Sequence, residues 1–177
     1  MNSSKSKNFN MVLAAMFLAF ALLLPFLTGQ LQQFGRSLCL MHIPILLCGF
    51  FCGPWYGLLV GLIAPILRFV LFGQPVLIPF GVSMSLELAT YGLVSGILYA
   101  KLPKKKSNIY VSLICAMLAG RIVWGISRVI FYGLGKETFG WTAFITGGFI
   151  EAVPGIVVQI IVIPLLVMAL NKYNEQS

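Results

Sequence analysis

The chain has 177 residues, of which 59% are hydrophobic and only 9% are charged. A soluble globular domain usually has about 25% charged residues, so this composition excludes a soluble domain and indicates a lipid environment. The net charge of +8 does not indicate nucleic-acid binding. Most of the basic residues lie instead at the chain ends or in one short loop, namely Lys5, Lys7, Lys101, Lys104, Lys105, Lys106 and Lys172.

Six apolar segments follow one another along the chain, and each has the pattern of a membrane helix. The first lacks a small-residue cleavage site after it, so we expect it to be retained rather than removed as a signal peptide. The run Leu38–Phe72 is too long for one span of about 20 residues, and Gly53-Pro54 divides it. The expected helices are Phe9–Leu27, Leu40–Cys52, Trp55–Phe72, Phe80–Ala100, Ile109–Tyr132 and Trp141–Leu170.

The expected fold class is therefore all-α, an integral membrane bundle of six transmembrane helices that forms a single domain over residues 1–177. With an even number of helices, both termini share a side with the basic loop Lys101–Asn108, while only Arg36 and Lys136 lie opposite. Because cytoplasmic segments carry the excess of Lys and Arg, we expect both termini in the cytoplasm. The polar tail Asn171–Ser177 lies on that side of a multi-pass protein of the cell membrane.

Charged side chains inside the spans are the most informative residues, because each costs roughly 2.5–3.5 kcal/mol at mid-helix. Their positions along the predicted helices place all but Arg121 in the external half, and Arg121 borders it. His42 is a further ionisable residue, near the outer end of the second helix. The charged residues within the spans are Arg68, Glu87, Arg121, Arg128 and Glu151.

Helical spacing places most of these charges on polar stripes. The stripes are Arg121, Trp124, Arg128 and Tyr132 on the fifth helix; Ser83, Glu87 and Thr90 or Tyr91 on the fourth; and Gly148, Glu151, Gly155 and Gln159 on the sixth. Polar faces within spanning helices turn toward one another rather than toward lipid. The three stripes therefore predict a polar cavity that opens to the outside.

Two interpretations of the intramembrane charges stay open. In the first, Arg and Glu pair as structural salt bridges, with Arg68 or Arg121 as the natural partner of Glu87. In the second, the surplus of three arginines over two glutamates meets an anionic ligand group such as a carboxylate. Trp124, between two arginines, is either a stacking platform for that ligand or a core residue.

The first helix carries a different signal, the small-residue pair Ala15 and Ala19. Two alanines four residues apart let another helix approach closely. This helix has no charge inside its span, so it contributes little to a polar cavity. Its alanine face is either a docking surface for a partner protein or a packing surface for the protein's own helices.

Several common catalytic and metal-binding patterns are absent from the sequence. There is no Walker A, HExxH or GxSxG motif, one histidine and no aspartate, so an enzyme is the weaker class and no cofactor is expected. Cysteines occur without histidine or acid at metal-ligand spacing, so no metal site is expected either. We expect all four to be buried small hydrophobes, namely Cys39, Cys48, Cys52 and Cys115.

The six-helix plan, the cytoplasmic termini and three local stretches together resemble a known family. The stretches are His42–Gly49, Glu87–Gly92 and Gly120–Gly125, and Ala15-x-x-x-Ala19 is similar to the family's docking motif. The chain resembles the substrate-binding S component of an energy-coupling factor (ECF) transporter, an importer of vitamins, and within it a pantothenate-like subgroup.

The resemblance implies a function and a set of partners. An S component binds its vitamin from outside through the external loops and helices 4 to 6, and then associates with a coupling membrane subunit and two ATPases. Pantothenate is the first substrate candidate, because its carboxylate suits Arg121 and Arg128 while its hydroxyls suit Glu87 and Glu151. The residues expected at the substrate are His42, Arg68, Glu87, Tyr91, Arg121, Trp124, Arg128, Glu151 and Gln159, and those expected at the coupling subunit are Ala15 and Ala19.

Other functions are compatible with the same residues. Another vitamin, such as cobalamin or a pyridoxine precursor, fits the charges nearly as well as pantothenate. A small membrane enzyme that acts on lipids is less favoured, because no catalytic constellation is visible. A structural or assembly protein without any ligand is a third class, and it predicts that no vitamin changes the melting temperature of the protein.

Overall fold

A computed structural model describes residues 3–28, 39–103, 105–134, 146–150 and 152–176 of the chain. Within these ranges the protein is helical and has no strand, which confirms the all-α fold class. The elements in chain order are α1 (Ser3–Leu23), η1 (Leu24–Thr28), α3 (His42–Cys52), α4 (Pro54–Phe72), η2 (Leu77–Gly81), α5 (Val82–Lys101), α6 (Lys106–Leu134), η3 (Thr146–Ile150) and α8 (Val153–Gln176).

Five of the helical segments are long and apolar enough to cross a membrane. They are Lys7–Phe26, Pro54–Phe72, Leu77–Lys101, Lys106–Tyr132 and Val153–Leu170. The sixth helix, α3, has 11 residues and a length of about 16 Å, roughly half of a hydrocarbon core of about 30 Å. Ten of its residues are buried, so α3 is an internal helix of the bundle and is enclosed by protein rather than by lipid.

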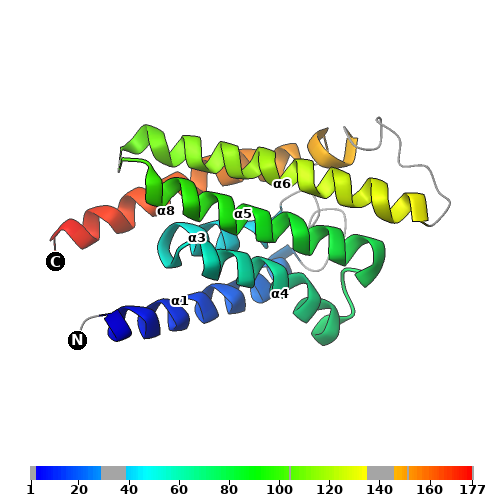
Figure 1. Cartoon of the computed structure of the whole chain (residues 1–177), viewed down its shortest axis with the longest axis horizontal. Helices are drawn as coiled ribbons and strands as arrows, with labels where there is room; N and C mark the ends of the chain where they lie inside the picture. Colours follow the sequence, from blue (N-terminus) through cyan, green and yellow to red (C-terminus); the bar gives the residue numbers. More distant parts are fainter. Residues whose placement is uncertain (1–2, 29–38, 104, 135–145, 151, 177) are drawn as a thin grey trace.

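Successive helices run in opposite directions along the bundle, and both chain ends lie at the same end of it (Figure 1). The N-terminus, the C-terminus and the connection between α5 and α6 all lie at the left of that view. This is the arrangement that the lysine distribution predicts. That this end faces the cytoplasm stays a prediction of the positive-inside rule.

The last expected helix, Trp141–Leu170, is divided within the described residues and ends later than expected, while its expected start at Trp141 lies outside them. Thr146–Ile150 forms the separate turn η3, Ala152 is a turn residue, and α8 begins only at Val153. Pro154 therefore occupies the first turn of α8, where a missing backbone N–H does no harm, instead of the helix interior. At the other end α8 continues to Gln176, so most of the expected polar tail is helical.

The loop expected between the third and fourth spans is also more ordered than its glycine and prolines suggest. Leu77–Gly81 forms the helical turn η2, interrupted by the extended residue Ile78 with φ −119° and ψ 130°. This turn leads directly into α5, so Phe80 stands at the outer end of that helix.

Glycines bring the backbones of α3, α4 and α5 into direct contact. A Cβ atom on Gly92 of α5 would overlap the backbone of Gly57 on α4, and one on Gly61 would overlap Leu88. Gly49 of α3 lies in the same way against the Gly92 carbonyl group. Without a large hydrophobic force between helices in lipid, such close packing of small residues holds spans together.

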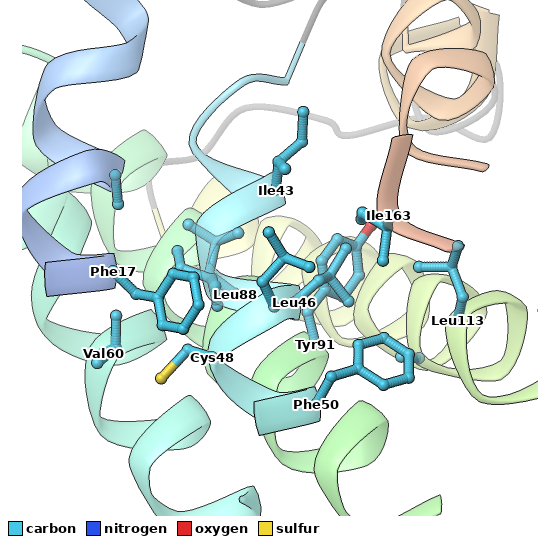
Figure 2. Close-up of a cluster of buried hydrophobic side chains, with 14 of the residues drawn as sticks. Phe17, Ile43, Leu46, Cys48, Phe50, Val60, Leu88, Tyr91, Leu113 and Ile163 are labelled. Atoms are coloured by element: carbon cyan, nitrogen blue, oxygen red, sulfur yellow. The ribbon is translucent and has the colours of Figure 1, made fainter. Parts of the chain in front are cut away.

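The core forms around α3, which packs between α1, α4, α5 and α8 (Figure 2). Leu46 and Cys48 of α3 are fully buried, and Phe17, Tyr91 and Ile163 approach them from three other helices. Of the cysteines, those at positions 39, 48 and 52 are buried as expected. The expectation for Cys115 was wrong, because it lies on an exposed face of α6, where a sulfhydryl meets lipid as easily as it meets a core.

We predict that Gly92→Ala lowers the thermal stability of the purified protein in detergent. The new methyl group meets backbone atoms of Gly57, which cannot move like a side chain, and overpacking of this kind costs roughly 1–3 kcal/mol. Gly147→Ala is the matched control, because its Cβ meets only the Trp124 ring at an ordinary 3.4 Å. Equal melting temperatures for the two variants would contradict the close crossing of α4 and α5.

Candidate functional site

The Glu87 carboxylate is the centre of a polar cluster inside the bundle. Glu87 lies in the second turn of α5 and is only 2% exposed. Its Oε1 atom is 3.0 Å from Arg121 Nη1, accepts a hydrogen bond of 3.1 Å from the Tyr91 hydroxyl, and lies 3.8 Å from His42 Nε2. The cluster thus joins α3, α5 and α6 through one carboxylate oxygen.

Local sequence positions these groups. Glu87 and Tyr91 are four residues apart on α5, so they share a helix face and their side chains meet. The Tyr91 ring packs against Gly120 of α6, where any side chain would overlap it. Because Arg121 follows Gly120, the close approach of the two helices brings its guanidinium group to the carboxylate. Of the two alternatives on α5, Tyr91 belongs to the polar stripe, while Thr90 bonds the Leu86 carbonyl group of its own helix.

His42 enters the cluster from the beginning of α3. It is the first residue of that helix and is 4% exposed, so the helix starts inside the bundle. The imidazole ring lies 5.4 Å from the Tyr91 ring, centre to centre. Just before α3, Cys39 Sγ is 4.0 Å from Arg121 Nη2, so the start of α3 contacts both α5 and α6.

The pairing of Glu87 with Arg121 decides part of the question about structural salt bridges. A buried charge without a counter-charge destabilises a protein by about 3–5 kcal/mol, so each member of this pair needs the other. Arg121 is therefore held by a protein carboxylate, as the structural interpretation expects. The same contact leaves the pair without net charge.

Arg128 lies in a second, aromatic environment on the same face of α6. Its guanidinium carbon is 3.8 Å from the centre of the Phe80 ring, 5.2 Å from Trp124 and 5.5 Å from Tyr132. Its Nη1 also donates a hydrogen bond of 3.3 Å to the Tyr132 hydroxyl. The side chain is 3% exposed, so these cation–π contacts act in a desolvated position, where they are strongest.

Trp124 completes the buried face of α6 between the two arginines. It is 7% exposed, and its ring lies 3.4 Å from the place where a Cβ atom on Gly147 of η3 would stand, so η3 covers this part of α6. Packing against η3 and contact with the Arg128 guanidinium group occur together. Trp124 can therefore be a core residue and still lie beside the guanidinium group of Arg128.

Arg68 belongs to a different part of the bundle. Its Nη1 donates a hydrogen bond of 3.2 Å to the Leu22 carbonyl group, and its guanidinium carbon lies 5.6 Å from the Phe26 ring. The side chain is half-buried between α4 and the end of α1. In the described part of the chain, the Glu87 carboxylate contacts Arg121 and His42. Arg68 contacts α1 and η1 instead.

The polar stripe predicted on the sixth helix is described in part. Gln159 of α8 is 1% exposed, and no described residue lies within hydrogen-bond distance of its Oε1 atom. Gly155 is buried on the same helix. Glu151 lies outside the described residues, so its predicted place at the site stays a prediction.

Two residues next to the charges were not among the predicted site residues. Phe80 has no spacing signal in the sequence, because it reaches Arg128 only through the turn η2. Cys39 precedes a helix whose inner start the sequence does not reveal. Within the described residues there is also no group of three His, Cys, Asp or Glu side chains that could hold a metal ion.

The two alanines of α1 both lie on the outside of the bundle. Ala15 and Ala19 are exposed, while Ala14 and Ala21 are buried against the core. The span Lys7–Phe26 is also the least enclosed of the five, with 17% of it buried against 50% for Lys106–Tyr132. The motif therefore faces away from the protein's own helices.

Comparison with known proteins agrees with this architecture. The family model described as the ECF transporter, substrate-specific component, matches residues 9–167, which is most of the chain. The comparisons with curated proteins and with solved structures gave no match. Members of the matched family are membrane-embedded transporter subunits that bind small-molecule substrates and work with a coupling membrane subunit and ATPases. The protein therefore belongs to the substrate-specific components of ECF transporters.

Proposed function

We propose that this protein binds a water-soluble vitamin at the external side of the cell membrane, with pantothenate as the first candidate. It then presents the vitamin to a coupling membrane subunit, and two ATPases supply the energy for uptake. The observation that carries the substrate proposal is the buried row of Arg121, Trp124 and Arg128 on one face of α6, inside a bundle made for substrate binding.

Arg128 is the residue that we assign to the carboxylate of the vitamin. A guanidinium group presents N–H donors in a planar fork that matches a carboxylate, and it is always charged. The aromatic rings of Phe80 and Trp124 hold this fork in place and exclude water from it. The same rings provide an apolar surface for the carbon skeleton of the ligand, in line with the stacking role predicted for Trp124.

The inner cluster supplies the remaining polar contacts of the proposed site. Pantothenate has hydroxyl and amide groups besides its carboxylate, and these need both donors and acceptors. Glu87, Arg121 and His42 offer such groups from three helices, and Gln159 offers another from α8. Arg68, which contacts α1, has a smaller part in this proposal than its charge suggested.

The first test is mass spectrometry of the ligand released from the purified protein. Pantothenate in the released fraction supports the proposal. Release of cobalamin or a pyridoxine precursor would replace the substrate and keep the transport function. If no ligand is released and no vitamin shifts the melting temperature, the structural class is favoured, and turnover of a lipid by the purified chain alone would favour an enzyme.

We predict that Arg128→Ala weakens pantothenate binding by roughly 10–100-fold, the loss expected when a hydrogen bond to a charged group is removed. Isothermal titration of the purified protein measures the effect. Ile126→Ala is the matched control, because Ile126 lies two residues away on the exposed, lipid-facing side of α6. If Arg128→Ala binds pantothenate as tightly as the control does, the carboxylate of the vitamin does not bind at Arg128.

We also propose that the exposed Ala15 and Ala19 form the docking surface for the coupling subunit. Ala15→Trp or Ala19→Trp is expected to abolish co-purification of the coupling subunit and vitamin uptake, because a large side chain prevents close helix approach. Vitamin binding by the isolated protein stays unchanged. Ala169→Trp is the control, since Ala169 is an exposed alanine on α8. Normal complex formation by the Ala15 and Ala19 variants would show that docking uses another face.

A further inference from the structure

Three buried polar side chains at the centre of the bundle have atoms that no described residue satisfies. They are Gln159 Oε1 on α8, both ring nitrogens of His42 on α3, and Arg121 Nε on α6. Each side chain is more than nine-tenths buried, with exposures of 1%, 4% and 7%. Buried polar atoms without a hydrogen bond destabilise a protein, so their retention in an apolar bundle indicates a ligand-binding role.

Two of the three side chains meet at Glu87, and the third lies on a helix packed against theirs. Arg121 and His42 both contact Oε1 of Glu87. Gln159 lies one turn before Ile163 on the same face of α8, and Ile163 and Tyr91 belong to one core cluster. Figure 2 draws Ile163 and Tyr91 within this cluster, and the Tyr91 hydroxyl bonds Glu87. Gln159 is on the buried side of α8, and α8 packs against α3 and α6, the helices that carry His42 and Arg121.

The charge of this region indicates what it binds. The carboxylate of Glu87 neutralises the guanidinium group of Arg121, and an anion placed here would meet that carboxylate. The unsatisfied atoms include an acceptor on Gln159, a donor on Arg121, and nitrogens on His42 that can act as either. A group that both donates and accepts hydrogen bonds and carries no charge matches them, which describes a hydroxyl or an amide.

We propose that His42, Arg121 and Gln159 form a deep subsite that receives an uncharged hydroxyl or amide group of the ligand. The inference rests on the proposed function, because it assigns one end of the vitamin to this subsite and the carboxylate to Arg128. Arg121 and Arg128 are seven residues apart on α6, which separates them by about 10 Å along the helix. The ligand is therefore elongated, with its acid outermost and its uncharged polar end innermost.

The first experiment compares ligand-free proteins by thermal unfolding. Gln159→Leu keeps the size of the side chain and removes the unsatisfied atom, so its melting temperature is expected to rise by roughly 2–4 °C. Ser112→Ala is the matched control, because its buried hydroxyl already donates to the Asn108 carbonyl group, and no rise is expected there. A fall in the melting temperature of Gln159→Leu would overturn the subsite, since it would show that Gln159 has a structural partner.

The second experiment measures binding of pantothenate and of pantothenol, in which an uncharged alcohol replaces the carboxylate. Gln159→Leu is expected to weaken both probes by the same factor, at least tenfold, while Arg128→Ala weakens only pantothenate. If Gln159→Leu weakens only pantothenate, the deep subsite holds the acid and the proposed orientation is wrong. If neither probe binds the wild-type protein, the pantothenate assignment fails, and the thermal comparison decides the subsite by itself.

Discussion

The ion pair between Glu87 and Arg121 is the interaction on which the arrangement of the inner bundle depends. Both charges lie within the depth of the membrane, where neither is tolerated alone, so α5 and α6 must adopt the rotation that joins them. The same carboxylate oxygen also contacts Tyr91 and His42, so the start of α3 is fixed to the pair. One contact thereby sets the relative position of three helices and shapes the region where a ligand is proposed to bind.

Close backbone packing and the polar cluster act on the same helices and depend on each other. Gly120 lets the Tyr91 ring lie against α6, and Gly92 lets α4 lie against α5. A side chain at Gly120 would push α5 and α6 apart and lengthen the distance between Glu87 and Arg121. Gly120 thus helps to position the ion pair, although it carries no polar side chain. Farther along α6, the Arg128 guanidinium group lies among the rings of Phe80, Trp124 and Tyr132.

Much of the fold was predictable because apolar runs, polar interruptions and lysines report directly on a bilayer. The order of the helices and the shared end of the termini follow from these signals, and so does the short length of α3. The start of α8 at Val153 did not follow from them, because a proline in an apolar run can stand either inside a kinked helix or in the first turn of a new one, as Pro154 does. Glu87 pairs with Arg121 and not with Arg68 because of how each helix is rotated about its axis. The spacing of residues along a single helix does not contain this information.

The half-length helix α3 depends on its neighbours for its place in the membrane. Eleven residues are too few to cross the hydrocarbon core alone, and the first N–H groups of the helix bond to the Cys39 and Leu40 carbonyl groups that precede it. Only Gly53 separates α3 from α4, so the two helices form one hairpin. α5 packs against both helices of this hairpin, and these contacts help to enclose α3 in protein.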